Sequence, residues 1–224
     1  MLTSFQILGP VTVVDSCGAN VTPRSAHQRT LLADLIIHAN QVVSVDRLVD
    51  DLWGTSPPLT ARSSLHNLVS QLRKTLDAET VITRGPGYAI LIQPEQLDSV
   101  CFERLVHKAS GQGPQDRVRS LEDALALWQG DQPLLDVLYE DFAQPAIRRL
   151  GELRSKAIED LCEARLAAAE GGVRSVETAR ELLPDLCAFV AAYPDRERFR
   201  SLLLTARDVS EARFEEALAS GSTV

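Results

Sequence analysis

The stretch that decides the fold runs from Ala61 to Tyr88 and reads ARSSLHNLVSQLRKTLDAETVITRGPGY. In its first part, leucine and valine recur three and four residues apart, which is the spacing of one face of an α-helix. The pattern predicts a helix that starts at Thr60 or Ala61 and ends at Leu76. Its buried stripe is expected to consist of Leu65, Leu68, Val69, Leu72 and Leu76.

A β-hairpin is expected directly after this helix. Residues 81–84 and 88–92 are rich in β-branched and aliphatic types, and they flank the turn sequence Gly85-Pro86-Gly87. Upstream of the helix, the order is sheet, helix, strand and helix, so the whole pattern is that of a winged helix preceded by a small sheet. The upstream elements are expected as short strands within residues 5–23, a helix from Ser25 to Asn40, a strand at 41–43 and a helix capped by Ser44 that ends at Trp53-Gly54.

The second half of the chain shows helical periodicity only, beyond a boundary at Gln93-Pro94-Glu95. Short connections between successive helices are typical of stacked α-hairpins, although no 34-residue repeat is found and the tetratricopeptide likeness is an analogy. The expected fold class is an α+β winged helix-turn-helix domain, residues 1–94, followed by an all-α tetratricopeptide-like helical domain, residues 95–224. The expected helices are 99–109, 116–128, 145–169, 176–192 (kinked or split at Pro184), 196–206 and 210–219.

Composition places the chain among soluble globular proteins, with 45% hydrophobic and 24% charged residues. No stretch approaches the roughly 20 apolar residues that span a bilayer, and the N-terminus has no signal-peptide pattern, so a cytoplasmic, nucleoid-associated protein without membrane contact is expected. The four cysteines are scattered and are predicted to be buried thiols. Motifs for metal, nucleotide or acyl-transfer chemistry are missing, which predicts no catalytic residue, no metal and no cofactor.

Charge is distributed unevenly along a chain whose formal net charge is −8. Residues 1–95 hold seven Lys and Arg against eight Asp and Glu, whereas residues 96–224 hold 16 against 23. The segment from Trp53 to Leu76 contains three cations and no acid, and the hairpin adds Arg84. Because affinity for nucleic acid comes mostly from cations that neutralise phosphates, this helix and hairpin are the elements expected to approach DNA without strong repulsion.

The polar face of the expected helix contains no carboxylate. Asn67 has the side chain that pairs with an adenine edge, and His66 and Ser63 are expected to contact bases or phosphates. A single exposed Lys or Arg is more often simply solvated, so that alternative stays open for each cation taken alone. The candidate DNA-binding residues are Thr60, Arg62, Ser63, His66, Asn67, Ser70, Arg73, Lys74 and Arg84, of which the four cations are expected chiefly to hold phosphates.

Several motifs match a known family pattern. They are Phe5-Gln6-Ile7-Leu8-Gly9-Pro10, Val45 to Gly54, Pro57-Pro58, Ala61 to Leu65, Val69 to Leu76 and Thr83 to Tyr88, then Ala124 to Gly130, Pro133-Leu134 and the helix from Leu150 to Leu166. The first half resembles the OmpR type of winged helix. The whole chain is similar to the Streptomyces antibiotic regulatory protein family, in which such a domain precedes a bacterial transcriptional activator domain.

This resemblance implies a pathway-specific transcription activator of secondary metabolism. It implies binding to direct repeats in double-stranded promoter DNA, as a homodimer on DNA, and recruitment of RNA polymerase. The family's recognition helix corresponds to residues 60–76 and its wing to residues 81–92. An alternative reading from the residues is an interaction module that binds no DNA and uses the winged fold as a dimer platform; an enzyme is disfavoured because no convergent acid, base or nucleophile is visible.

Overall fold

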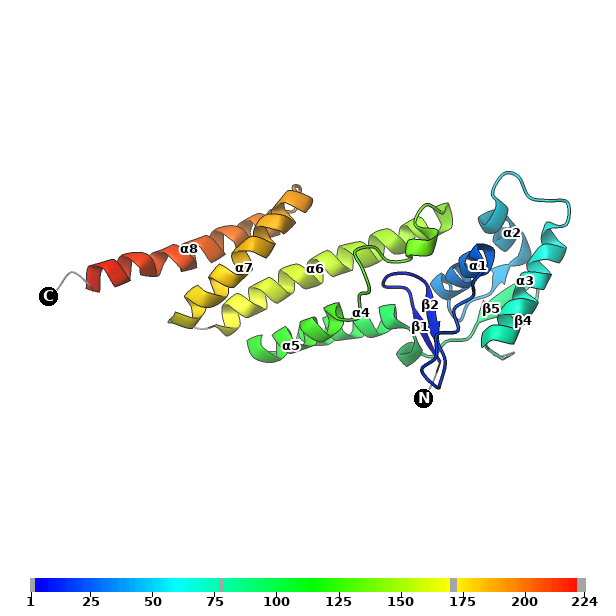
Figure 1. Cartoon of the computed structure of the whole chain (residues 1–224), viewed down its shortest axis with the longest axis horizontal. Helices are drawn as coiled ribbons and strands as arrows, with labels where there is room; N and C mark the ends of the chain where they lie inside the picture. The colour runs from blue at the N-terminus through cyan, green and yellow to red at the C-terminus, as the bar shows by residue number, and fades with distance from the viewer. Residues whose placement is uncertain (1–2, 77–78, 170–172, 221–224) are drawn as a thin grey trace. The chain divides into compact units, whose positions relative to one another are not determined.

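A computed structural model describes residues 3–76, 79–169 and 173–220 (Figure 1). The chain divides into two compact units, one made of Met1–Arg104 with Ala126–Leu153 and the other of Leu105–Leu125 with Arg154–Val224. The first unit holds the strands, and the described part of the second is helical. The expected fold class, a winged helix followed by a helical domain, is confirmed. The domain division between residues 94 and 95 stays a prediction.

The N-terminal sheet consists of β1 (Ser4–Gln6) and β2 (Thr12–Val14), which pair antiparallel with Phe5 opposite Val13. The third β-rich run expected here, residues 19–23, is not a strand and makes only one isolated bridge, from Asn20 to Val14. Two backbone bonds join this run to the end of β2, from Asp15 to Ala19 and from Val21 to Val13, but side chains take others: Asn20 accepts from the N–H of Thr22, whose hydroxyl accepts from the N–H of Val13. Such local bonds compete with a strand ladder, which explains the wrong prediction.

The wing is a three-stranded antiparallel sheet in the order β3-β5-β4, formed by β3 (Val43–Ser44), β4 (Val81–Arg84) and β5 (Gly87–Ile90). The predicted hairpin is confirmed, with a loop of two residues in which Gly85 has a φ of +54°. A positive φ at the first loop position is the usual task of glycine in such hairpins. Gly87 is needed for a different reason, because a Cβ atom there would lie 1.9 Å from the carbonyl oxygen of Val43.

Three helices complete the winged helix: α1 (Ala26–Ile37), α2 (Val45–Trp53) and α3 (Ala61–Leu76). They contact one another pairwise around a core of leucines. The predicted cap of α2 is confirmed, since the Ser44 hydroxyl accepts from the N–H of Arg47 at 3.2 Å. The core leucines that are fully buried include Leu31, Leu32, Leu35, Leu48, Leu65 and Leu72.

Helix α1 ends three residues earlier than predicted. Asn40, the expected end, has a φ of +65° and lies beyond the last helical residue, Ile37. Its backbone N–H donates to the carbonyl of Ile90 at 2.9 Å, and its side-chain amide donates to Ile92 at 2.9 Å and accepts from it at 3.1 Å. The chain therefore leaves the helix early because Asn40 is bound to the wing.

The segment Ala126–Leu153 packs on the N-terminal sheet within the first unit. Its backbone N–H groups at residues 129, 134 and 135 donate to the carbonyls of Leu8, Ile7 and Gly9 at 2.8 to 3.1 Å. At the start of α4 (Asp98–Ala109), the buried Asp98 carboxylate accepts from the N–H groups of Ile7 and Leu8. Burial raises the pKa of Asp98 to about 6, against the opposing effect of these N–H groups.

The second unit is built from α5 (Pro114–Leu125), the C-terminal part of α6 (Gln144–Ala168), α7 (Val173–Ala192) and α8 (Glu197–Ser220). Helices α7 and α8 pack along each other (Figure 1). The core here consists of Cys162, Ala179, Leu182, Leu186, Phe199, Leu202 and Ala206.

Two helix predictions in this unit are wrong. The helices expected at 196–206 and 210–219 form one continuous helix, α8, because neither Gly nor Pro stands between Ala206 and Ser210. The expected split at Pro184 is wrong, because α7 runs through it, whereas the alternative of a kink there stays a prediction. The side chain of Pro184 is exposed, so the carbonyl that loses its partner lies on the solvent side.

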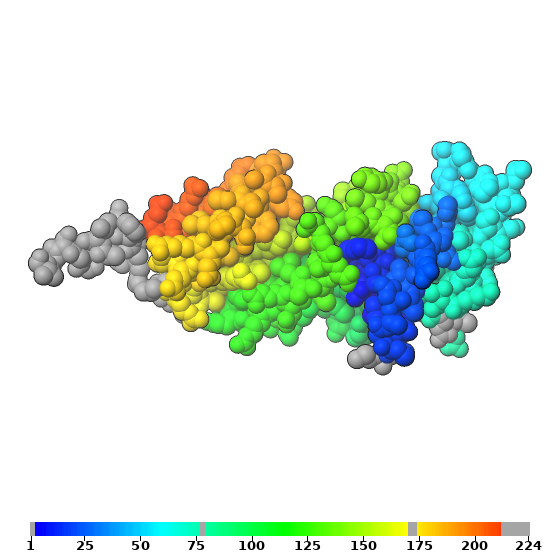
Figure 2. Space-filling view, in the orientation of Figure 1, coloured from blue at the N-terminus to red at the C-terminus, as the bar shows by residue number. Residues whose placement is uncertain are grey.

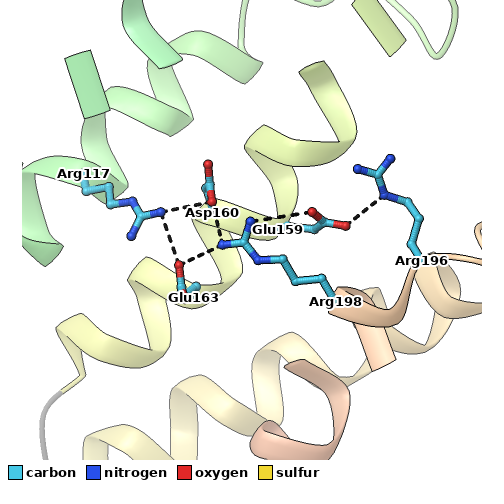
Figure 3. A network of polar contacts seen from close by, with 6 residues as sticks. All are labelled: Arg117, Glu159, Asp160, Glu163, Arg196 and Arg198. Atoms are coloured by element: carbon cyan, nitrogen blue, oxygen red, sulfur yellow. Dashed lines mark hydrogen bonds and ion pairs between the residues drawn. The ribbon is translucent and has the colours of Figure 1, made fainter. Parts of the chain in front are cut away.

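An ionic network joins α5, α6 and the start of α8 (Figure 3). Arg198 contacts Asp160 at 2.7 Å and Glu163 at 2.9 Å, and Arg117 contacts the same two carboxylates at 3.0 and 3.2 Å. The buried Glu159 contacts Arg196 at 2.9 Å and Arg198 at 3.8 Å. Three cations and three acids are thus mutually paired, and we call this set of six residues the ionic network.

The cysteine prediction is largely wrong. Only Cys162 is buried, where burial raises the pKa of its thiol to about 11. Cys17 and Cys187 are exposed and Cys101 is half-buried. Cys17 lies in a turn closed by the Asp15 side chain, which accepts from its N–H at 2.8 Å, and turns of this kind keep their side chains at the surface.

Candidate nucleic-acid interface

Helix α3 buries one face and exposes the other, as its spacing predicts. Leu65, Val69, Leu72 and Leu76 are buried, while Leu68, the fifth expected member of the stripe, is half-buried. Figure 2 shows the α3 segment, in cyan, at the surface of the first unit. The residues of the opposite, polar face that are exposed are Ser63, Asn67, Ser70 and Lys74.

Two of the candidate cations, Lys74 and Arg84, are exposed, and no described residue forms an ion pair with either of them. Lys74 lies in the last turn of α3, and Arg84 ends β4 beside the hairpin loop. Neither makes an ion pair within the ranges that the structure describes. Among the described residues, no carboxylate therefore neutralises either charge.

Arg62 is exposed and contacts Asp46, a residue in the first turn of α2. The side chains of this pair are 67% and 75% exposed, so the contact is weak and open to exchange. The segment from Trp53 to Leu76 holds no acid, but the fold brings one to it from a neighbouring helix. Asp46 is thus a nearby carboxylate that the linear charge count could not reveal.

Arg73 connects α3 to the wing. Its Nε–H donates to the carbonyl of Val81 at 2.7 Å, and its Nη2 donates to the Thr83 hydroxyl at 2.9 Å. The guanidinium carbon also lies 5.8 Å from the centre of the Tyr88 ring. Arg73 therefore sets the position of β4 relative to α3, a role that the sequence reasoning missed when it described this residue only as a phosphate contact.

Thr60 and His66 are exposed at the margins of the polar face. The Nδ1 atom of His66 lies 2.5 Å from the hydroxyl of Tyr88, and the two rings meet edge to face with centres 6.0 Å apart. Burial raises the pKa of the Tyr88 hydroxyl, and which of the two groups donates depends on the tautomer of His66. In the tautomer that carries its proton on Nε2, His66 accepts from Tyr88 at Nδ1 and has a donor left for another partner.

A contact between α1 and α3 adds a residue that the sequence reasoning did not select. Gln71 is exposed on α3, and its Oε1 accepts from the Nε2 of Gln28 on α1 at 2.5 Å. A polar residue one turn from Asn67 and Lys74 was visible in the sequence, but its partner was not. All nine candidate residues lie on α3, at its N-terminal edge or on the wing.

Neither a metal site nor a membrane span emerges from the described ranges. Within them, no group of three or more His, Cys, Asp or Glu side chains is placed to hold a metal ion. No described helix is both long enough and apolar enough to cross a bilayer.

Two family models match the chain. The model described as "Transcriptional regulatory protein, C terminal" matches residues 20–90, which include α1 to α3 and the wing. The model described as "Bacterial transcriptional activator domain" matches residues 97–220. Together they define the class: a transcriptional regulator in which an OmpR-type DNA-binding domain precedes an activator domain.

Similarity to individual proteins identifies the family within this class. The transcriptional regulator RedD of Streptomyces coelicolor is 33% identical over 211 residues, which make up 89% of this chain and 57% of RedD. The regulatory protein AfsR of the same species is 34% identical over 220 residues, 96% of this chain and 21% of AfsR. The chain belongs to the Streptomyces antibiotic regulatory protein family. Because this is a family of transcriptional regulators, the prediction that the protein is not an enzyme is confirmed.

A solved structure supports the same assignment. It is described as Mycobacterium tuberculosis EmbR in complex with a low affinity phosphopeptide, and it matches this chain with a TM-score of 0.82 at 28% identity. The match covers 100% of this chain and 61% of the EmbR chain. The order of winged helix and helical domain is therefore shared with a mycobacterial relative.

Proposed function

We propose that this protein binds specific promoter DNA through the polar face of α3 and the wing, and that it activates transcription from there. The observation that carries the proposal is an exposed helix face without a carboxylate, bordered by Lys74 and Arg84, whose charges are not paired within the described fold. An α-helix fits the major groove, and cations beside it neutralise phosphates.

The candidate residues divide into two groups. Asn67 reads an adenine edge, while Ser63, Ser70, His66 and Thr60 contact bases or phosphates through their hydroxyl groups and ring N–H. Lys74 and Arg84 hold phosphates, and Arg62 joins them when it exchanges Asp46 for DNA. Arg73 holds phosphate with the donors that its bonds to the wing leave over, and it keeps the wing in place beside the helix.

The wider activity follows from the family. Two protomers bind side by side on direct repeats, as a homodimer on DNA, with half-sites about one helical turn apart if they lie on the same face. The activator domain recruits RNA polymerase, and the regulated genes belong to one pathway of secondary metabolism. Support comes from membership in a family of antibiotic regulators and from the similarity to RedD and AfsR.

A gel-shift series tests this proposal. The full chain is mixed with DNA from the promoters next to its own gene and, separately, with a shuffled DNA of equal length and composition. A retarded band that survives excess shuffled competitor is expected, with footprints repeated at half-site spacing. If the protein is instead an adaptor that binds no DNA, no specific band will form on any of these promoters.

A further inference from the structure

The second unit contains a groove that the proposed DNA contacts do not use. It has a volume of about 530 Å³ and lies between α5, the end of α6 and the first half of α7. This volume falls within the range of small-molecule sites, roughly 300 to 1,000 Å³. Its floor includes the buried Ala169 and Leu182, and its rim carries Arg119, Arg165 and Arg174 together with Glu122 and Glu181.

Charges in the groove are paired much less completely than those in the ionic network. In the network, three arginines meet three carboxylates at 2.7 to 3.8 Å (Figure 3). Among the described residues that line the groove, the one close ion pair is Arg165 with Glu122, at 2.7 Å. Arg119 lies 3.7 Å from Asp116, with both side chains more than two-thirds exposed. The groove therefore holds arginines with donors to spare.

Among the groove residues, Arg174 gives the strongest indication that the groove binds an anion. It is exposed at the start of α7, and no ion pair is found for it within the described ranges. Glu181, the other acid of the rim, is also without an ion pair there, so the described residues that line the groove include three cations and two acids. This surplus stands out in residues 96–224, where acids exceed cations by 23 to 16.

The lining also defines the body of a ligand. Ala168 and Ala169 line the groove with short side chains, and Leu182 adds an apolar surface. An arginine fork binds a carboxylate or a phosphate through two parallel hydrogen bonds. Because Glu122 and Glu181 share the rim, a group with one negative charge is repelled less than a phosphate with nearly two.

We propose that this groove binds a carboxylate carried by an apolar body, with the carboxylate on Arg174 and Arg119 and the body over Ala169 and Leu182. A free organic acid and the C-terminal residue of a peptide both present this chemistry. The site belongs to the second unit and all nine DNA candidates belong to the first, so the two functions can fail separately.

Isothermal titration calorimetry on the full chain tests the site with octanoate, and with a hexapeptide that ends in Ala-Leu and has either a free or an amidated C-terminus. Binding of octanoate or of the free-acid peptide is expected, and the difference between them identifies the source of the carboxylate. Octanamide and the amidated peptide are expected to bind at least about tenfold more weakly, since a hydrogen bond to a charged group is worth roughly 1.5 to 3 kcal/mol.

Arg174→Ala is expected to weaken binding of the active probe about tenfold or more, by the same reasoning. Arg180→Ala is the matched control, because Arg180 is exposed on a different face of α7 and does not line the groove. The proposal is overturned if neither acid binds, if the amides bind as well as the acids, if octyl phosphate binds more tightly than octanoate, or if both arginine variants behave like the unsubstituted protein. A gel shift of Arg174→Ala that matches the unsubstituted protein shows that the DNA site is intact.

Discussion

The surface formed by α3 and the wing contains several cations, and so does the ionic network. The two regions differ in how these cations are paired with carboxylates. In the network, Arg117, Arg196 and Arg198 each contact carboxylates on α6. On α3 and the wing, Lys74 and Arg84 have no such partner within the described residues. Whether a cation is available to bind a phosphate depends on its pairing with carboxylates and not on the overall composition. A chain with a net charge of −8 can therefore still present a surface suited to a polyanion.

The largest effect is expected from reversing both available cations. The double variant Lys74→Glu, Arg84→Glu replaces two attractive phosphate contacts by repulsive ones and should lower promoter affinity about 1,000-fold, or roughly 4 kcal/mol. Fluorescence anisotropy with labelled promoter DNA measures it. The control Lys108→Glu, Arg180→Glu changes the net charge equally at exposed positions outside the candidate interface. Equal losses in the two variants would show that only overall charge matters.

The buried Asp98 carboxylate, which accepts from backbone N–H groups, should make the stability of the protein depend on pH. The folded pKa of Asp98 is about 6, above the unfolded value of 3.8, so the folded state binds its proton more tightly. Its contribution to stability is therefore present below about pH 4 and is lost as the pH rises to about 6, by about 3 kcal/mol at most. Urea unfolding of the parent and of Asp98→Asn measures this.

The stability deficit of Asp98→Asn should shrink between pH 4 and pH 7, because the parent loses stability over that range and the neutral amide does not titrate. A deficit that grows with pH would mean that the N–H groups of Ile7 and Leu8 favour the ionised carboxylate more than burial disfavours it.

Breaking the ionic network should destabilise the second unit more than breaking an exposed pair destabilises the first. Glu159→Gln removes the charge of the buried carboxylate that contacts Arg196 at 2.9 Å and should cost about 2 kcal/mol of unfolding free energy. Arg62→Ala removes the exposed pair with Asp46 and should cost less than about 0.5 kcal/mol. Comparable urea midpoints for the two variants would show that the ionic network contributes no more to stability than the exposed Arg62–Asp46 pair does.

The smallest expected effect concerns one base pair. Asn67→Ala should relax the preference at a single position of the half-site by about 1 kcal/mol or somewhat more, while leaving affinity for unrelated DNA nearly unchanged. Thr75→Ala on the same helix is the control, since Thr75 is exposed but bonded to the carbonyl of Gln71. Selection from randomised half-sites measures the preference, and an unchanged preference profile would mean that Asn67 contacts no base.

Local patterns in the sequence predicted the parts of the fold that depend on neighbouring residues. The stripe of α3, the hairpin around Gly85 and the Ser44 cap each have a signal within a few positions. The early end of α1 could not be predicted, because Asn40 bonds to residues 50 and 52 positions away. The continuous α8 was expected as two helices, although neither Gly nor Pro stands between Ala206 and Ser210.

In the candidate site, too, some features follow from local sequence patterns and others depend on contacts between distant residues. The exposure of Ser63, Asn67 and Lys74 follows from helical spacing alone. The bonds from Arg73 to the wing and the approach of Asp46 to Arg62 depend on contacts between separate elements, and no local pattern encodes them. The sequence therefore predicts the face, but it does not show which of its cations contact other described residues.

The dependence of promoter affinity on salt tests the central claim most directly. With roughly four phosphate contacts per protomer, the logarithm of affinity should fall against the logarithm of salt concentration with a slope near −4 for each bound protomer. Lys74→Ala should reduce the size of that slope by about one, and Lys108→Ala should leave it unchanged. Affinity that does not depend on salt, or equal slopes for all three proteins, would contradict the assignment of this face to DNA.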